Sequence, residues 1–236
     1  MRLNDPQLVR DEYASETGLE ARRSIYTDIE GPDAREEAFR TIAELAPEDV
    51  LEVGPGPGEL SERISRELGA RVVAVDSSER MVELARGRGV DARRGDVQEL
   101  PFEDESFDCV VAAWMLYHVA DVDAGLREIA RVLRPGGHLV AVTNSEEHLA
   151  EARAYGGVDM RGRSPFSREN AEPQLRSHFS HVERRDVDGF VTFAGHEDVR
   201  RYVSSMVAMR GKAADVPEFE GPLRATRRVS IYLARR

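Results

Sequence analysis

The amino-acid sequence predicts an α/β fold in which a mostly parallel sheet of seven strands carries helices on both faces. Three observations point to this fold. From Val50 onward, short apolar segments alternate with segments of helical length, as in successive βαβ units. The strand-like segments are apolar almost throughout, which is typical of strands that are buried on both faces. A glycine-rich turn joins the first strand to its helix, at a place where such sheets commonly bind a ligand.

The elements are predicted in chain order. Residues 1–47 are expected to form a helical N-terminal lid, with helices over residues 5–16 and 33–45, separated by Gly31-Pro32 and with Asp33 as an N-cap. The alternating region then follows with strands at 50–53, 72–75, 90–94, 107–113 and 138–143, and helices at 59–68, 79–87 and 122–133. The segment 133–137 is interpreted as a turn that stops a helix before a strand.

After Asn144 the alternation weakens. Helices are expected at 146–154, 167–179 and 197–209, the second with Ser167 as its N-cap, and strands at 181–193 and 228–234 form an antiparallel finish to the sheet. The whole chain, 1–236, is interpreted as a single domain. It consists of the lid (1–47), a ligand-binding core (48–145), and a substrate-side insertion with the final strands (146–236).

Composition narrows the possible partners. The formal net charge of −11 argues against a nucleic-acid partner, because such proteins present basic surfaces to phosphates. No apolar run approaches the roughly 20 residues of a membrane-spanning helix, and the first eleven residues lack the apolar region of a secretory signal. Cys109 is the only cysteine, so an internal disulfide is impossible, and the histidines show no metal-ligand spacing. A cytoplasmic protein without a metal site is expected.

The turn after the first strand carries glycines at every second position, Gly54, Gly56 and Gly58. Asp76 ends the next strand, 22 residues after Gly54, where a carboxylate can accept both hydroxyls of a ribose. An ordinary tight turn and an N-cap role for Asp76 are the structural alternatives. Dinucleotides and S-adenosylmethionine (SAM) both use this arrangement. Glu59 stands where the dinucleotide fingerprint has its third glycine and would repel a diphosphate, which disfavours NAD.

Four stretches together resemble a known family, the class I SAM-dependent methyltransferases and in particular their type-11, UbiE-like group. The stretches are VLEVGPGPGELS, VVAVDSSERMVELAR, GDVQELPFEDESFDCVVAAWMLYHV and REIARVLRPGGHLVAVTNS, in that order between Val50 and Ser145. The resemblance implies a Rossmann-like sheet and S-adenosyl-L-methionine as the cofactor.

The resemblance also implies cofactor-binding roles for matching positions. The loop from Glu52 through Gly54 and Gly56 to Gly58 would lie beside the methionine part, and Asp76 would hold the ribose. Ser77 and Met81 would line the adenine, Asp96 and the Val97 amide would contact its edge, and Ala113 and Trp114 would approach the methionine end, with Tyr13 closing over it from the lid.

Methyl transfer from a sulfonium is an in-line displacement that depends mainly on positioning, and a general base is needed only for a protonated nucleophile. His118 is the best candidate for that base, with orientation of the loop as its structural alternative, and Tyr117 is interpreted as a pocket wall. Other aromatic or sulfur side chains are possible walls, namely Tyr26, Tyr155, Phe166, Tyr202 and Met206.

The predicted function is methyl transfer to an O, N or C atom of a small molecule by a monomer or homodimer. A non-catalytic SAM-binding partner protein and, less favoured, an NAD-type oxidoreductase are the alternatives. The sequence does not identify the methyl acceptor.

Overall fold

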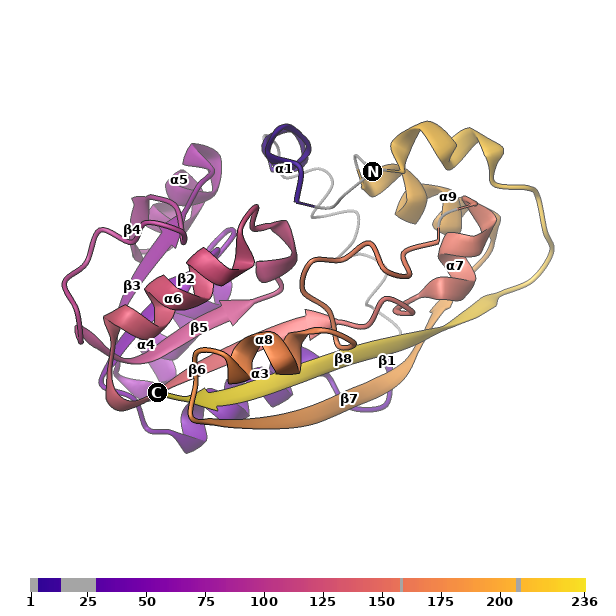
Figure 1. Ribbon diagram of the computed structural model, residues 1–236. Helices are drawn as coiled ribbons and strands as arrows, with labels where there is room; N and C mark the ends of the chain where they lie inside the picture. The colour runs from indigo at the N-terminus through magenta and orange to yellow at the C-terminus, as the bar shows by residue number, and fades with distance from the viewer. Residues whose placement is uncertain (1–3, 14–28, 158, 207–208) are drawn as a thin grey trace.

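The computed structural model describes residues 4–13, 29–157, 159–206 and 209–236 (Figure 1). Within them one mixed sheet runs in the order β1-β7-β8-β6-β5-β2-β3-β4. The strands from β6 to β4 are parallel to one another, and β8, β7 and β1 are added in antiparallel pairings. The strands are β1 (Ile29–Glu30), β2 (Asp49–Val53), β3 (Arg71–Asp76), β4 (Asp91–Arg94), β5 (Phe107–Ala113), β6 (Leu133–Asn144), β7 (His181–Phe193) and β8 (Leu223–Arg235).

The order of the strands creates a switch point between β2 and β5. The chain proceeds from β2 outward to β3 and β4, then returns to β5 on the other side of β2. The loops after β2 and β5 therefore diverge at the carboxyl edge of the sheet, which is where open α/β sheets form their ligand crevices.

Helices cover both faces of the sheet (Figure 1). The helices are α1 (Pro6–Glu12), α3 (Ala34–Glu44), α4 (Glu59–Leu68), α5 (Glu79–Gly87), α6 (Val122–Val132), α7 (Ala150–Tyr155), α8 (Ala171–Arg176) and α9 (His196–Ser205), with 3₁₀ turns at Leu116–His118 and Arg210–Asp215. Leu126 and Ile129 of α6 and Leu175 of α8 are buried on one face. Ile42 of α3 and Ile64 of α4 are buried on the other.

A further apolar cluster lies under α7 and α9, beyond the central strands. Phe193 of β7 and Ala225 of β8 pack there against Leu149 and Val203. The long strands β7 and β8 thus extend past the core and support a second layer of helices at one end of the molecule (Figure 1).

The predicted fold class is confirmed, with an eighth strand in place of the seven expected. Ile29–Glu30 pairs with Val191 and Phe190 in a region predicted to be helical. The helices 59–68 and 79–87 and the strands 107–113 and 181–193 have the predicted bounds. Residues 14–16 of the first predicted helix, and Tyr26, lie outside the described residues.

Two predicted elements differ most from the structure. Residues 133–137 belong to β6, where the pairing shifts from Phe107↔Leu133 to Cys109↔His138, so the predicted turn is an irregular stretch of the strand. The helix predicted over 167–179 is reduced to α8. Ser167 is not its N-cap, because its buried hydroxyl has no hydrogen-bond partner among the described residues and helix α8 begins only at Ala171.

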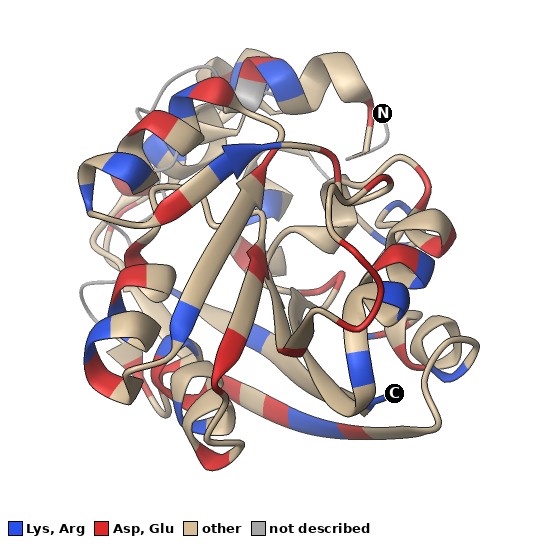
Figure 2. Ribbon diagram, turned by 90° about the vertical axis from the view of Figure 1, so that its left-hand side faces the viewer, with Lys and Arg blue, Asp and Glu red and all other residues tan. Residues whose placement is uncertain are grey.

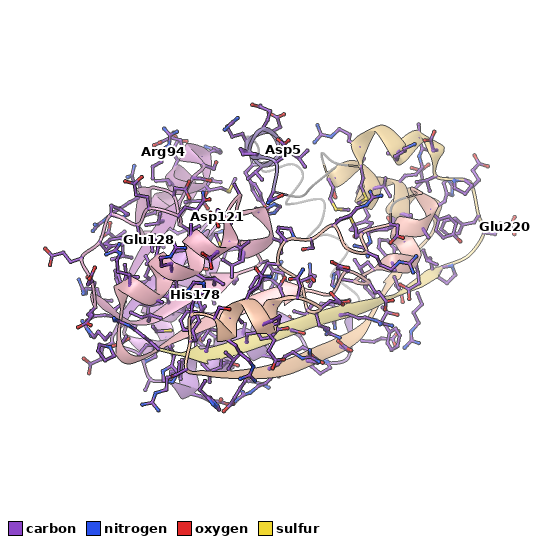
Figure 3. The ribbon with its side chains drawn as sticks, in the orientation of Figure 1. Asp5, Arg94, Asp121, Glu128, His178 and Glu220 are labelled. Atoms are coloured by element: carbon purple, nitrogen blue, oxygen red, sulfur yellow. The ribbon has the colours of Figure 1, made fainter. Side chains whose placement is uncertain are left out.

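Charged side chains of both signs are interspersed over the helices, while the central strands are largely uncharged (Figure 2). Figure 3 shows His178, just past the end of α8, pointing toward α6, where its Nε2 lies 2.8 Å from Asp123 Oδ1. Among the described residues, no helix is long and apolar enough to cross a bilayer.

Candidate cofactor and acceptor site

Each of the three glycines of the first βα turn has a positive φ, but the atoms around the three positions differ. Gly54 has φ +65°, and a side chain there would lie 2.7 Å from Cβ of Met115. Gly58 has φ +83°, and its added Cβ would lie 2.8 Å from Cβ of Ala85. Gly56 has φ +56° with no atom within 4 Å of an added Cβ. Packing therefore requires glycine at two positions, whereas at Gly56 the backbone faces open space.

Asp76 ties this turn to the turn after β3. Its Oδ2 accepts a hydrogen bond from the Gly56 amide at 3.3 Å, and its Oδ1 accepts one from the Ser78 amide at 2.9 Å. Burial raises the pKa of Asp76 to about 6, against the lowering effect of these backbone donors. A carboxylate fixed in this way at the carboxyl edge still has acceptor capacity for a ligand hydroxyl.

Glu52 is the most deeply buried carboxyl at this edge, with 2% of its surface exposed. The Ser61 hydroxyl on α4 donates a hydrogen bond to its Oε2. Burial and, to a smaller extent, the nearby charge of Asp76 raise the pKa of Glu52 and outweigh the lowering effect of the Ser61 hydrogen bond, so the pKa is about 7. Glu52 is thus a group that titrates near neutral pH behind the glycine turn.

The N-terminal segment closes over the same edge, and Asp5 marks the start of its helix α1 (Figure 3). The Tyr13 hydroxyl shares a hydrogen bond of 2.9 Å with Nε2 of His118, and the two rings meet edge to face. The Tyr13 carbonyl accepts from the Ser78 hydroxyl at 3.1 Å. Asn4 donates to the carbonyl of Val119 at 3.3 Å. The segment therefore bridges the loops that follow β3 and β5.

Trp114 directly follows β5 in a strained conformation, with φ +54°. Its amide donates to the Val142 carbonyl at 2.9 Å, and its indole Nε1 donates to Oδ1 of Asn144 at 3.1 Å. These bonds hold the indole across the carboxyl ends of β5 and β6.

A cavity of about 590 Å³ opens between α3, the glycine turn, the ends of β5 and β6, and the middle of β8. Six of the predicted cofactor residues line it, and they are Tyr13, Glu52, Gly54, Gly56, Ala113 and Trp114. Tyr117, the predicted wall, also lines it. The possible walls Tyr155, Phe166, Tyr202 and Met206 do not, because they pack into other apolar clusters.

The remaining predicted residues do not line this cavity, and they are Gly58, Asp76, Ser77, Met81, Asp96, Val97 and His118. Met81 is fully buried in the core, Val97 is buried, and Ser77 is exposed. Asp96 is exposed and accepts from the Gln98 amide at 2.9 Å. The cofactor roles of these residues and the catalytic role of His118 stay predictions.

Sequence reasoning missed part of the cavity wall. Asn144 was detectable as the polar residue at the end of β6, by the same logic that singled out Asp76. His148 and Arg227, both buried, line the cavity from the region after β6 and from β8. Among the described residues, no group of three or more His, Cys, Asp or Glu side chains could hold a metal ion.

The comparisons with known proteins agree with this geometry. Residues 51–141 match the type-11 methyltransferase domain family. Residues 51–141 are therefore similar to a SAM-dependent methyltransferase domain. The class predicted from the four stretches is therefore confirmed.

Two curated relatives are informative. The chain is 39% identical over 107 residues to the ubiquinone/menaquinone biosynthesis C-methyltransferase UbiE of Hahella chejuensis, which covers 41% of this chain and 43% of that protein. It is 39% identical over 147 residues to a ubiquinone biosynthesis O-methyltransferase of Xanthomonas euvesicatoria, covering 56% of this chain and 61% of that protein. The matches thus span between about a third and three fifths of the curated relatives' length.

Among solved structures, N-methyltransferase 2 of Haemonchus contortus, in complex with phosphomonomethylethanolamine and S-adenosylhomocysteine, superposes with a TM-score of 0.65. The match has 19% identity and covers 96% of this chain and 60% of that chain. At this identity the likeness concerns the fold alone.

Proposed function

We propose that the protein transfers a methyl group from SAM to an O, N or C atom of a small-molecule acceptor. The observation that carries the proposal is the cavity of about 590 Å³ that runs from the glycine turn to Trp114 and on toward β8. It is large enough for a ligand of drug-like size, and it adjoins the family's cofactor loop.

The residues at the carboxyl edge fit SAM. Gly56 leaves open space where a ligand can approach the backbone, and Asp76 offers carboxylate oxygens beside it. Pro55 and Pro57 remove two amide donors from the turn, which suits a ligand without a diphosphate. When bound there, SAM supplies a methyl group already activated by its sulfonium.

The contribution of this chain would then be alignment and exclusion of water. Trp114, fixed by Asn144, forms a rigid wall at the end of β5. Tyr13 covers the opening from the lid side. Positioning of this kind can contribute roughly 7–11 kcal/mol to lowering a barrier.

His118 is proposed as the general base for an acceptor that must lose a proton. Its Nε2 faces the Tyr13 hydroxyl, which itself lines the cavity, so a proton from the acceptor would reach His118 through that hydroxyl. His118→Ala should lower turnover by roughly 10²–10⁴-fold while S-adenosylhomocysteine affinity is kept, and Tyr13→Phe should lower it similarly. A change below threefold in His118→Ala would make the histidine an orienting residue.

With this function we propose that the protein is a single domain that acts as a monomer or homodimer in the cytoplasm. Its partner is a small molecule and not a nucleic acid. The acidic net charge of −11 supports the choice of partner. Sedimentation would measure the oligomeric state.

The test is transfer of radiolabelled methyl from SAM to a panel of small metabolites. A labelled product that the native protein forms and Asp76→Ala does not would support the proposal. Binding of S-adenosylhomocysteine without turnover on any acceptor would favour the non-catalytic alternative. Absence of binding by the native protein would reject both.

A further inference from the structure

Arg227 brings an unusual charge into the cavity wall. It lies on β8 with only 2% of its surface exposed. Its Nε donates to the Phe190 carbonyl at 3.2 Å, and its Nη2 donates to the carbonyls of Glu30 at 3.3 Å and Pro32 at 2.9 Å. All of these acceptors are neutral. Among the described residues, no carboxylate pairs with the guanidinium and none accepts from Nη1.

The surrounding strands are shaped to hold this side chain. Gly189 of β7 is the register partner of Arg227, and a Cβ added there would lie 2.4 Å from the Glu30 carbonyl oxygen on β1 and 2.6 Å from Nη2 of Arg227. The φ of Gly189 is not in the left-handed region, so the backbone does not itself demand glycine. Space for the β1 backbone and for the guanidinium that donates to it requires glycine at this position. A buried charge that is offset only by carbonyls is costly unless a counter-ion reaches it.

The neighbourhood of Arg227 is positive. His148 lines the same cavity, and its Nδ1 lies 3.0 Å from the amide nitrogen and 3.2 Å from the carbonyl oxygen of Arg228. Burial, together with the charges of Arg153 and Arg227, lowers the pKa of His148 to about 3. Arg153 is itself buried, and its Nε has no hydrogen-bond partner among the described residues.

Among the described residues, none of the carboxylates that line the cavity accepts a hydrogen bond from Arg227. Glu36 pairs with Arg63, and Glu59 pairs with Arg88. Asp33 accepts from the Arg35 amide at the start of α3. Glu52 lies on β2, three strands away from β8, behind the glycine turn.

The position of Arg227 separates it from the methyl-transfer edge. Val229 is the register partner of Asn144 at the end of β6. Arg227 precedes Val229 by two residues, and because β8 is antiparallel to β6 it lies beyond the end of β6. At about 3.3 Å per residue, Arg227 stands roughly 7 Å beyond the edge that Asn144 marks.

We propose that Arg227, with neutral His148 next to it, binds an anionic oxygen group of the methyl acceptor, a carboxylate or a phosphate. The assignment rests on the proposed function, because it treats this end of the cavity as the acceptor end. Arginine suits the role, since its charge is permanent and its N–H groups match such oxygens. Tyr117 and Trp114 in the same cavity give the acceptor's body an aromatic wall.

The test uses fluorine NMR on the protein saturated with S-adenosylhomocysteine. The probes are 4-fluorobenzoate, 4-fluorophenyl phosphate and the neutral 4-fluorobenzamide, and the two anions distinguish a carboxylate site from a phosphate site. At least one anion should bind tenfold or more tightly than the amide. Arg227→Gln and the apolar Arg227→Met should remove that preference while changing amide binding less than twofold. Arg228→Gln, which removes the surface partner of Glu147, is the matched control and should keep the preference.

The outcomes separate the proposals. Calorimetry with S-adenosylhomocysteine comes first, and absence of binding would reject the proposed function itself. Binding of S-adenosylhomocysteine with no preference for either anion would overturn the subsite alone. Because this comparison uses the native protein, it decides even if both variants misfold. A loss of S-adenosylhomocysteine affinity in Arg227→Met, with anion binding unchanged, would assign the guanidinium to the cofactor's carboxylate and also overturn the proposal.

Discussion

Glu52→Gln is expected to make the protein more stable at alkaline pH and to flatten the pH dependence of its stability. Glu52 is buried behind the glycine turn, and burial raises its pKa from 4.5 to about 7. Glutamine keeps the volume of the side chain and an oxygen that can accept from the Ser61 hydroxyl. It does not ionise, so the substitution removes the titration and little else.

The direction follows from proton binding. Between pH 4.5 and about 7 the folded protein holds a proton at Glu52 that the unfolded chain has released. Stability therefore falls as the pH rises through this range, and the whole loss is present above pH 7. At 1.36 kcal/mol per pH unit the total is about 3 kcal/mol, of which roughly 2.5 kcal/mol falls between pH 5 and pH 8.5.

The assay is urea unfolding of both proteins at pH 5 and pH 8.5, followed by the fluorescence of Trp114, the single tryptophan. Other groups titrate in the same range, so the relevant quantity is the difference between variant and native protein at each pH. That difference should shift in favour of Glu52→Gln by roughly 2.5 kcal/mol from the lower to the higher pH. Glu62→Gln, which removes a carboxylate that pairs with Arg88 at the surface, controls for the loss of one charge.

A difference that stays constant within about 0.5 kcal/mol across the two pH values would refute the reasoning. It would mean that Glu52 is ionised in the folded protein as readily as in water. A shift of the opposite sign would mean that the carboxylate, and not the acid, is the form that the fold stabilises.

Two further predictions concern the same edge of the sheet. Gly54→Ala should lower the free energy of unfolding by about 2–4 kcal/mol, because strain at positive φ adds to a clash with Met115, whereas Gly56→Ala should cost only about 1–2 kcal/mol; urea unfolding would compare them. A larger loss for Gly56→Ala would contradict the open space beside it. The affinity for S-adenosylhomocysteine should fall up to about tenfold per pH unit below pH 6, because Asp76, with its pKa raised to about 6, must be ionised to accept ribose hydroxyls. Calorimetry at pH 5 and pH 7 measures this affinity, and equal values at the two pH values would contradict the role of Asp76.

The parts of the fold that sequence reasoning located well are those with local signals. Helix α5 has the predicted bounds because Ser78 is its N-cap and its side chain accepts a hydrogen bond from the Met81 amide. The apolar residues of the helix also recur with helical spacing. The strand β1 has no such signal. Ile29–Glu30 becomes a strand only because Val191 and Phe190 on β7 are available to pair with it.

The same contrast holds for the site. The glycine turn and Asp76 were recognisable because their spacing is local in the sequence. Arg227 was not, since a charged residue in a strand ordinarily indicates an exposed position. Its carbonyl partners lie 37, 197 and 195 residues away, at Phe190, Glu30 and Pro32. Only the tertiary fold brings these acceptors together.

The most direct measurement is a calorimetric titration of the native protein and of Asp76→Asn with S-adenosylhomocysteine at pH 7.5. If the glycine turn and the end of β3 together bind the adenosyl group, the native protein takes up one equivalent and the variant binds at least tenfold more weakly, since a charge-assisted hydrogen bond contributes about 1.5–3 kcal/mol. Equal affinities in the two proteins, or no heat of binding in either, would contradict the assignment of this edge as the cofactor site.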